Sequence, residues 1–358
     1  MKQTIFLFSV LLALSFGSFD ARACTGITLH AADGSHVVGR TIEWGESALK
    51  SDYVVAPRGY RWQSFTPSGH NGAKVVARYG LVGLSVVEPA FIAEGINEKG
   101  LSAGLFYFPG YGEYEAYDAS SNDITIADLQ LVAWMLSQFA TVDEVMAAIP
   151  TIKVVGLYPN ASTVHWRIAD PSGKQYVLEY IDGEPHFYEN KIGVLTNSPG
   201  FEWQVTNLNN YVNLYPGSAN PQQLGGVELA PFGAGSGFLG IPGDVTPPSR
   251  FVRAAFYANT APVPKTAFDA MTQSFHILNN FDVPIGIEHP IGKAPDIPAA
   301  TQWTTVTDMT NRRIYYRTAY NFNIRCIDCS TIDFARVAYT SKPLDEVQRQ
   351  PVEMLTIK

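Results

Sequence analysis

Hydrophobic and polar residues alternate along much of the chain after residue 23, which is typical of strands with one face against a core. The stretch TGITLHA, the turn ADGS and the stretch HVVGRTIEW together predict a β-hairpin over residues 25–44. We expect a second hairpin around residues 74–89, and a turn at residues 97–100 that leads into the strand LSAGLFYF. The N-terminal part is therefore predicted to be mainly β.

The apolar spacing changes to three and four residues in two later parts of the chain, which predicts helices. Residues 125–139 and the segment TVDEVMAAI show this spacing first, and Thr141 is an N-cap signal for the second of them. Two further amphipathic helices are predicted at residues 249–259 and 265–281.

Between and after these helices the pattern returns to antiparallel strands, joined in several places by Asp-Gly or Pro-Ser-Gly turns. The order β, α, β, α, β predicts a layered α+β fold with helices packed on sheets. Residues 207–248 are rich in loops, but no repeat or low-complexity linker divides the chain. We therefore expect residues 24–358 to form one domain. The later strands are expected at residues 162–170, 175–181, 186–191, 192–199, 303–321 and 322–328.

Residues 1–23 have the three parts of a secretory signal peptide. Lys2 gives a positive start, residues 5–19 are apolar, and Ala21 and Ala23 are small residues at positions −3 and −1 of a cut before Cys24. The apolar run is shorter than the roughly 20 residues of a membrane span, and no later run is longer. The sequence thus predicts a periplasmic or secreted protein without membrane contact after cleavage. An uncleaved N-terminal anchor is the alternative.

The charge of the chain argues against one class of partner. The formal net charge is −8, and it becomes −9 for residues 24–358 because the leader carries two basic residues and one acidic one. No cluster of Lys and Arg stands out, so nucleic acid is not an expected partner.

Three cysteines, Cys24, Cys326 and Cys329, are an odd number for an exported protein. Cys326 and Cys329 form a C-x-x-C that could be a redox pair, half of a metal site or a local disulfide. Without a second pair or a His cluster we favour two structural thiols, bridged or not, and expect no metal. Cys24 is then the remaining thiol.

Common catalytic motifs are missing: there is no P-loop, no G-x-G-x-x-G after a strand, no H-E-x-x-H and no G-x-S-x-G, and the seven His residues are scattered. A cut before Cys24 would place a thiol and an α-amine on one residue. Their reference pKa values lie near 8.5 and 8, so the amine can accept the thiol proton, directly or through a water molecule. The nucleophile would then carry its own general base.

Two other interpretations of Cys24 remain open at this point. A lipoprotein would acylate the same residue, although such a signal normally has Leu or a similar residue at −3, where this chain has Ala21. A plain structural cysteine is the third option.

Seven segments, in their order and spacing, make the chain resemble the choloylglycine hydrolase family, from Cys24 to about Asp328. This family includes conjugated bile acid hydrolases and penicillin V acylases, which are N-terminal-nucleophile amidohydrolases. The resemblance implies a four-layer αββα fold with two stacked antiparallel sheets flanked by helices, no cofactor, and a family that is often tetrameric, so that a homotetramer is one expected assembly. The segments are CTGITL, GRTIEW, NEKGLSAGLFYFPGY, TNSPGFEWQVTNLNNY, SGFLGIPGD, PSRFVRAAF and WTTVTDMTNRRIYYRT.

The resemblance gives the N-terminal hairpin a catalytic task. Cys24 matches the nucleophile, and Arg40 matches the arginine beside its sulfur, where a cation favours the thiolate. Glu43 stands where the family usually has the Asp that holds the cysteine amine. The extra methylene keeps the charge and changes the reach of this contact. A surface Arg and a solvated Glu are the structural alternatives.

Three further positions match the family. Asn197 corresponds to the asparagine whose side-chain NH₂ donates to the oxyanion, Arg250 to a second arginine of the site, and we expect the nearby Arg253 to face solvent. Tyr107, before Phe-Pro-Gly, resembles the penicillin V acylase branch, because bile acid hydrolases typically have Asn there. Its backbone N–H would be the second oxyanion donor and its ring would shape the acyl pocket. An Asx-turn and a core aromatic are the alternatives for Asn197 and Tyr107.

The resemblance therefore implies an exported hydrolase of linear C–N amide bonds with a small acyl amide as substrate. Penicillin V acylase-like substrates, including acyl-homoserine lactones, are the first expectation, and glycine- or taurine-conjugated bile acids the second. Loops around residues 45–70 and 155–165 are expected to decide between them. The alternative from another class is a non-catalytic periplasmic binding protein or lipoprotein on the same fold.

Overall fold

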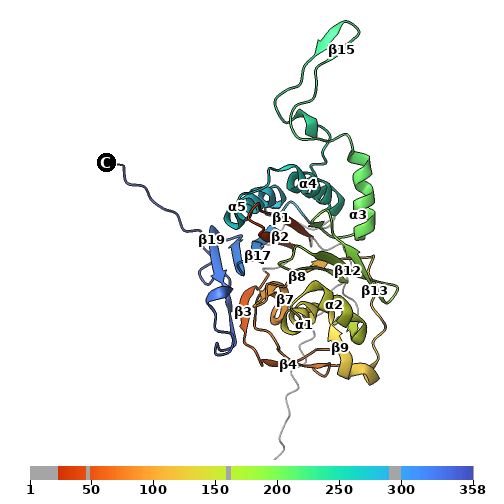
Figure 1. Ribbon diagram of the computed structural model, residues 1–358, viewed down its shortest axis with the longest axis vertical. Helices are drawn as coiled ribbons and strands as arrows, with labels where there is room; N and C mark the ends of the chain where they lie inside the picture. The colour runs from red at the N-terminus through yellow and green to blue at the C-terminus, as the bar shows by residue number, and fades with distance from the viewer. Residues whose placement is uncertain (1–22, 46–48, 159–162, 290–299, 358) are drawn as a thin grey trace, which may run out of the picture.

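The computed structural model describes residues 23–45, 49–158, 163–289 and 300–357. The predicted leader, apart from Ala23, lies outside these residues, as do parts of both loops expected to line the pocket. Two large antiparallel sheets form the centre of the described molecule, and helices cover the outer face of each (Figure 1). This is the predicted αββα arrangement.

The first large sheet has six strands in the order β14-β1-β2-β17-β18-β19. Strand β1 lies between β14 and β2, so the N-terminal hairpin is in the interior of the sheet rather than at its edge. The bounds are β1 (Ala23–His30), β2 (His36–Trp44), β14 (Val194–Leu195), β17 (Ala300–Asp308), β18 (Arg313–Thr318) and β19 (Asn321–Asp328).

The second large sheet has eight strands in the order β13-β12-β11-β8-β7-β6-β3-β20. Strand β8 is central in it and contacts β1 of the other sheet. The bounds are β3 (Asp52–Ala56), β6 (Leu81–Val86), β7 (Glu88–Asn97), β8 (Ser102–Tyr107), β11 (Val164–Ala169), β12 (Gln175–Ile181), β13 (Glu184–Glu189) and β20 (Thr340–Pro343).

The helices form the outer layers. Helices α4 (Pro247–Thr260) and α5 (Ala267–Leu278) pack on β1, β2 and β17, while α1 (Leu131–Gln138) packs on β7 and β8 (Figure 1). The remaining helices are α2 (Val142–Ala148), capped by Thr141 as predicted, α3 (Phe201–Asn207), and the 3₁₀ segments η1 (Ala119–Ile124), η2 (Asp128–Gln130), η3 (Ile149–Thr151), η4 (Leu208–Tyr211), η5 (Ser236–Phe238), η6 (Asn279–Phe281) and η7 (Cys329–Thr331). None of the described helices is long and apolar enough to cross a membrane.

Small two-stranded sheets complete the fold and correct two predictions. Residues 74–89 do not form a hairpin: β5 (Lys74–Val76) pairs with β4 (Arg61–Gln63), and β6 pairs with β3 and β7. The predicted helix 125–139 begins instead with β9 (Thr125–Ala127), which pairs with β10 (Lys153–Val155), because its first residues complete a tertiary strand pair. The hairpin of β15 (Gln222–Leu224) and β16 (Val227–Leu229) projects from the body (Figure 1).

Glycines on the two central strands let charged and aromatic side chains enter the space between the sheets. A Cβ on Gly26 of β1 would lie 2.8 Å from the ring of Phe106 on β8, and a Cβ on Gly104 would lie within contact distance of the Glu94 carboxylate. Since alternate residues of a strand share a face, Cys24 points to the same side as Gly26, toward the second sheet.

Candidate active site

Cys24 lies in the second position of β1 and is 4% exposed. Its thiol meets a guanidinium from the neighbouring strand: Arg40 Nη2 donates to Cys24 Sγ at 2.7 Å. The register of the hairpin explains this approach, because Gly26 pairs with Arg40 and Cys24 pairs with Ile42, which puts Cys24 and Arg40 on one face. Arg40 is thus a buried partner of the sulfur and not a surface residue.

Backbone carbonyls and an aromatic ring hold Arg40 in place. Its Nε donates to the Thr41 carbonyl, and Nη1 donates to the carbonyls of Ala93 and Leu105. The guanidinium carbon lies 4.2 Å from the centroid of the Phe106 ring. The Arg40 guanidinium is thus held facing the sulfur and is shielded from solvent.

Burial raises the pKa of the Cys24 thiol, and the positive charge of Arg40 opposes this shift. The backbone N–H of Tyr107 also points to the sulfur and favours the thiolate. Tyr107 is the last residue of β8, which faces β1, and its side chain is partly exposed. The structure therefore brings the predicted backbone donor to the Cys24 sulfur.

Asn197 follows β14 and joins three parts of the site. Its amide oxygen accepts from the Cys24 N–H at 2.9 Å and from Arg250 Nη2 at 2.7 Å, and its Nδ2 donates to the Tyr107 carbonyl at 2.7 Å. An amide NH₂ has two hydrogens, so one remains for a substrate oxygen. These contacts are long-range, which distinguishes Asn197 from the local Asx-turn considered above.

Arg250 reaches the site from the first turn of α4. Its Nη1 donates to the carbonyl of Cys24 and, at 2.8 Å, to Thr25 Oγ1, and its Nε donates to the Val245 carbonyl. The neighbouring Arg253 does not face solvent as expected: it is 7% exposed and donates to the carbonyls of Pro242 and Asp244. Both arginines therefore hold the loop before the helix, and of the two only Arg250 donates to Cys24.

Glu43 is on the other face of β2 and is 1% exposed, so it is not a solvated edge charge. Thr301 Oγ1 donates to its Oε1 at 3.0 Å, whereas Oε2 accepts no hydrogen bond from the described residues. Burial raises the pKa of Glu43 to about 7, although Arg250 pulls it down. Its cross-strand partner is Ala23, the residue before the predicted cut.

A buried carboxylate balances the charge behind Arg40. Glu94 on β7 forms an ion pair with Arg167 on β11 and lies 4.0 Å from Arg40 Nη1. This pair was not among the residues predicted from the sequence. A charged residue inside the apolar strands AFIAEGI and VHWRIA was the available signal, because strands buried on both faces rarely carry one.

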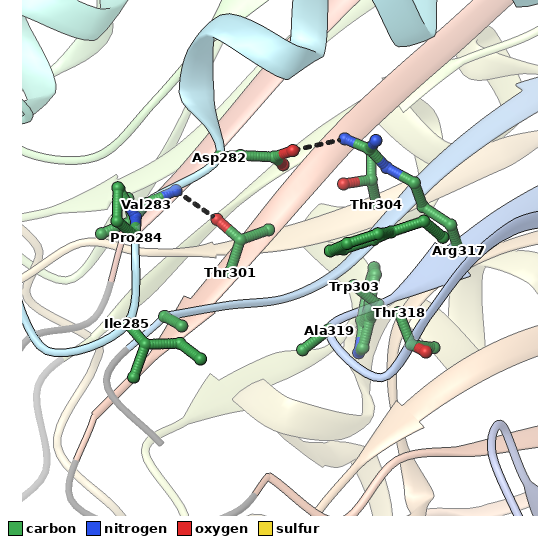
Figure 2. Close-up of a pocket in the computed structure, with 12 residues that line it drawn as sticks. Asp282, Val283, Pro284, Ile285, Thr301, Trp303, Thr304, Arg317, Thr318 and Ala319 are labelled. Atoms are coloured by element: carbon green, nitrogen blue, oxygen red, sulfur yellow. Dashed lines mark hydrogen bonds and ion pairs between the residues drawn. The ribbon is translucent and has the colours of Figure 1, made fainter. Parts of the chain in front are cut away.

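A pocket opens between residues 282–285, which follow η6, and strands β17 and β18 (Figure 2). Thr301 lines it and donates to Glu43, and Asp282 and Arg317 form an ion pair at 2.7 Å across its rim. Cys24, Arg40 and Asn197 do not line this pocket.

The described residues contain no group of three or more His, Cys, Asp or Glu side chains placed to hold a metal ion. Cys326 and Cys329 are free thiols; Cys329 is buried, which raises its pKa to about 12.

Comparison with known proteins shows what this chain is similar to. The family model described as linear amide C–N hydrolases, choloylglycine hydrolase family, matches residues 24–345. A bile salt hydrolase/transferase of Clostridium perfringens is 33% identical over 85% of this chain and 92% of its own length. A penicillin V acylase of Pectobacterium atrosepticum is 27% identical over 96% of this chain and 91% of its own. A crystal structure of the mutant conjugated bile acid hydrolase from C. perfringens superposes with a TM-score of 0.81, at 29% identity, over 93% of this chain and all of the other.

Proposed function

Because this chain belongs to the choloylglycine hydrolase family, whose members hydrolyse linear C–N amides, we propose that it does so with Cys24 as an N-terminal nucleophile. The observation that carries the proposal is the contact of Cys24 Sγ with Arg40 Nη2 at 2.7 Å, with the Tyr107 N–H directed to the same sulfur. The chemistry is acyl transfer through a thioester.

In the first step the Cys24 α-amine takes the thiol proton while the sulfur attacks the amide carbonyl carbon. The negative charge that forms on the carbonyl oxygen is stabilised by the Tyr107 N–H and the remaining N–H of Asn197. Arg40 lowers the cost of the thiolate in a buried site. When the C–N bond breaks, the protonated amine gives its proton to the leaving nitrogen.

In the second step the amine, now neutral, takes a proton from water, and the hydroxide attacks the thioester carbonyl. The same donors stabilise the second oxyanion. The C–S bond breaks, the acid leaves, and the proton on the amine returns to the sulfur. No atom other than those of the amide, one water and Cys24 changes its bonding.

Maturation is part of the proposal. In the described chain the Cys24 nitrogen is a peptide N–H bonded to Ala23, and it becomes a base only when that bond is cut. The Ala-Arg-Ala sequence supports removal of residues 1–23 by a signal peptidase, hence a periplasmic or secreted enzyme. Glu43 would then hold the new amine, since it lies opposite the residue that leaves.

For the substrate, we favour penicillin V acylase-like acyl amides, including acyl-homoserine lactones, because Tyr107 precedes Phe-Pro-Gly and is partly exposed. Conjugated bile acids are the second candidate. The 33% identity to the C. perfringens bile salt hydrolase/transferase favours them.

The experiment is a panel of penicillin V, glycocholate, taurocholate and acyl-homoserine lactones, offered to the exported protein after its intact mass is measured. We expect a mass that begins at unmodified Cys24 and hydrolysis of the first or last substrate. Cys24→Ser should lose this activity, whereas the control Cys326→Ser, which changes an exposed thiol, should keep it. A lipidated or uncleaved terminus, or activity that survives Cys24→Ser, would refute the proposal. Mass photometry of the same sample tests the expected homotetramer.

A further inference from the structure

A buried histidine and glutamate lie behind the site and take no part in the mechanism above. His165 on β11 is 0% exposed and Glu179 on β12 is 1% exposed. The His165 Nδ1 lies 2.9 Å from Glu179 Oε1, and its Nε2 lies 3.1 Å from the Thr196 carbonyl oxygen. Buried polar groups of this kind cost free energy unless they are hydrogen-bonded, and both ring nitrogens of His165 and the Oε1 of Glu179 have partners.

The hydrogen positions follow from the partners. The Thr196 carbonyl can only accept, so His165 Nε2 carries a hydrogen. Nδ1 and Glu179 share a second hydrogen, whichever of the two atoms holds it. The pair is therefore closed on itself and has no proton to offer to a substrate.

Two contacts of His165 each end one residue from a proposed oxyanion donor. Thr196 directly precedes Asn197 and is held by Nε2. On the other side the ring of Phe108, which directly follows Tyr107, stacks on the imidazole with centroids 4.3 Å apart and an interplanar angle of 7°. The two donors come from segments ninety residues apart in the chain, and His165 touches the neighbour of both.

Glu179 extends the same support along the Asn197 segment. Its Oε1 accepts from the Phe201 N–H at 3.0 Å, at the start of α3. The segment from Thr196 to Phe201 is thus held at its first residue by His165 and at its last residue by Glu179. Asn197 lies between these two points.

We propose that the His165–Glu179 pair is a positioning device that sets the separation of the two oxyanion donors, the Tyr107 N–H and the Asn197 NH₂. This rests on the proposed function, which assigns these donors. Because oxyanion donors act only when they meet the developing charge, a displacement lowers kcat far more than substrate binding.

His165→Phe tests the device while it keeps a ring to stack on Phe108 and removes both hydrogen bonds. We expect kcat to fall by up to about 100-fold with KM within about twofold, since misplacement of about 1 Å can have that effect. Alkylation of Cys24 by iodoacetamide needs the thiolate, which Arg40 and the Tyr107 N–H favour, but no oxyanion donor, so its rate should change far less than kcat. An aldehyde analogue of the acyl group, which forms a tetrahedral adduct with the thiol, should lose affinity in proportion to kcat/KM.

Two further variants keep the test decisive. Glu179→Gln retains an acceptor for the Phe201 N–H and should show the same pattern more weakly, which covers the case that His165→Phe does not fold. His30→Phe, at the far end of the hairpin, is the control and should leave kcat unchanged.

The inference is overturned if folded His165→Phe keeps the wild-type kcat, or if alkylation and kcat fall together, which would indicate a general structural role. A separate measurement distinguishes failure of this inference from failure of the proposed function. If alkylation of wild-type Cys24 leaves the activity intact, the nucleophile assignment fails, whatever the His165 variants do.

Discussion

Replacing Glu43 by Gln isolates one charge next to the nucleophile. The carboxylate is buried, accepts a hydrogen bond from Thr301 and has a pKa raised to about 7 by burial. Gln has nearly the same volume and keeps an oxygen for Thr301, so the substitution removes little besides the ionisation.

The expected effect has a definite sign. An opposite charge within about 4–6 Å shifts a pKa by about 1–3 units, or about 1.4–4 kcal/mol. In the mature protein the Glu43 carboxylate would raise the pKa of the Cys24 ammonium, and the ammonium would lower the pKa of Glu43. The amine must be neutral to accept the thiol proton. Without the carboxylate it becomes neutral at lower pH, so the acid limb of kcat/KM should move to lower pH by about 1–3 units.

The assay is kcat/KM for the best amide of the panel, between about pH 5 and pH 9, because this ratio reports ionisations of the free enzyme. Asp128→Asn is a matched control: Asp128 is also a buried carboxyl with a raised pKa, but it lies in η2 beside α1, on the other sheet. It should leave the acid limb in place. An acid limb that stays unmoved in Glu43→Gln, with an intact N-terminal cysteine, would refute the link between Glu43 and the amine.

Three other substitutions have expected outcomes. Asn197→Asp keeps the oxygens that accept from Cys24 and Arg250 but loses the donor, so kcat should fall by about 10²–10³ or more while iodoacetamide still alkylates Cys24; an undiminished kcat would exclude Asn197 as a donor. Gly26→Ala places a methyl 2.8 Å from the Phe106 ring and should lower the free energy of unfolding in urea by about 1–3 kcal/mol. It should also slow Cys24 alkylation, because the shifted ring lies under Arg40. An unchanged urea midpoint would show that Phe106 has room to move. Asp128→Asn should flatten the pH dependence of the free energy of unfolding. The pKa of Asp128 is about 6 in the fold and about 3.8 in model compounds, so the folded state binds more protons between these pH values. The stability of the wild type should therefore fall by up to about 3 kcal/mol as pH rises from about 4 to 6. Equal slopes in the two proteins would contradict that shift.

The parts of the fold that the sequence predicts best are those with local signals. The hairpin of β1 and β2 has alternation and an Asp-Gly turn, and the Thr141 cap is a contact within one turn of chain. The layered α+β class and the residues around the thiol followed from these elements and from the resemblance. The contacts between these residues, such as the hydrogen bond from Asn197 to the Tyr107 carbonyl, are seen only in the structure.

The errors arise where a partner distant in sequence decides the conformation. Residues 125–127 have helical spacing but pair with β10, and residues 74–76 join β4 instead of the next strand. Arg253 was placed in solvent because a helix pattern cannot show that the loop before it folds back over its side chain. Likewise, no spacing rule connects His165 with residues near 196 and 108.

Ala23 sits inside β1, 5% exposed and paired with Glu43. Peptidases bind the cleaved strand in an extended, accessible form. The Ala23–Cys24 bond is paired with β2, and its N–H donates to Asn197, so it is available to them only when this part of the sheet has opened. If residues 1–23 are removed as proposed, their cleavage must therefore take place before this sheet closes. A chain that folds first would be a stable but inert precursor, with its catalytic nitrogen still an amide. Under the proposed export, the yield of active enzyme would then depend on how long the chain stays unfolded before cleavage, and a faster-folding variant would give less activity rather than more.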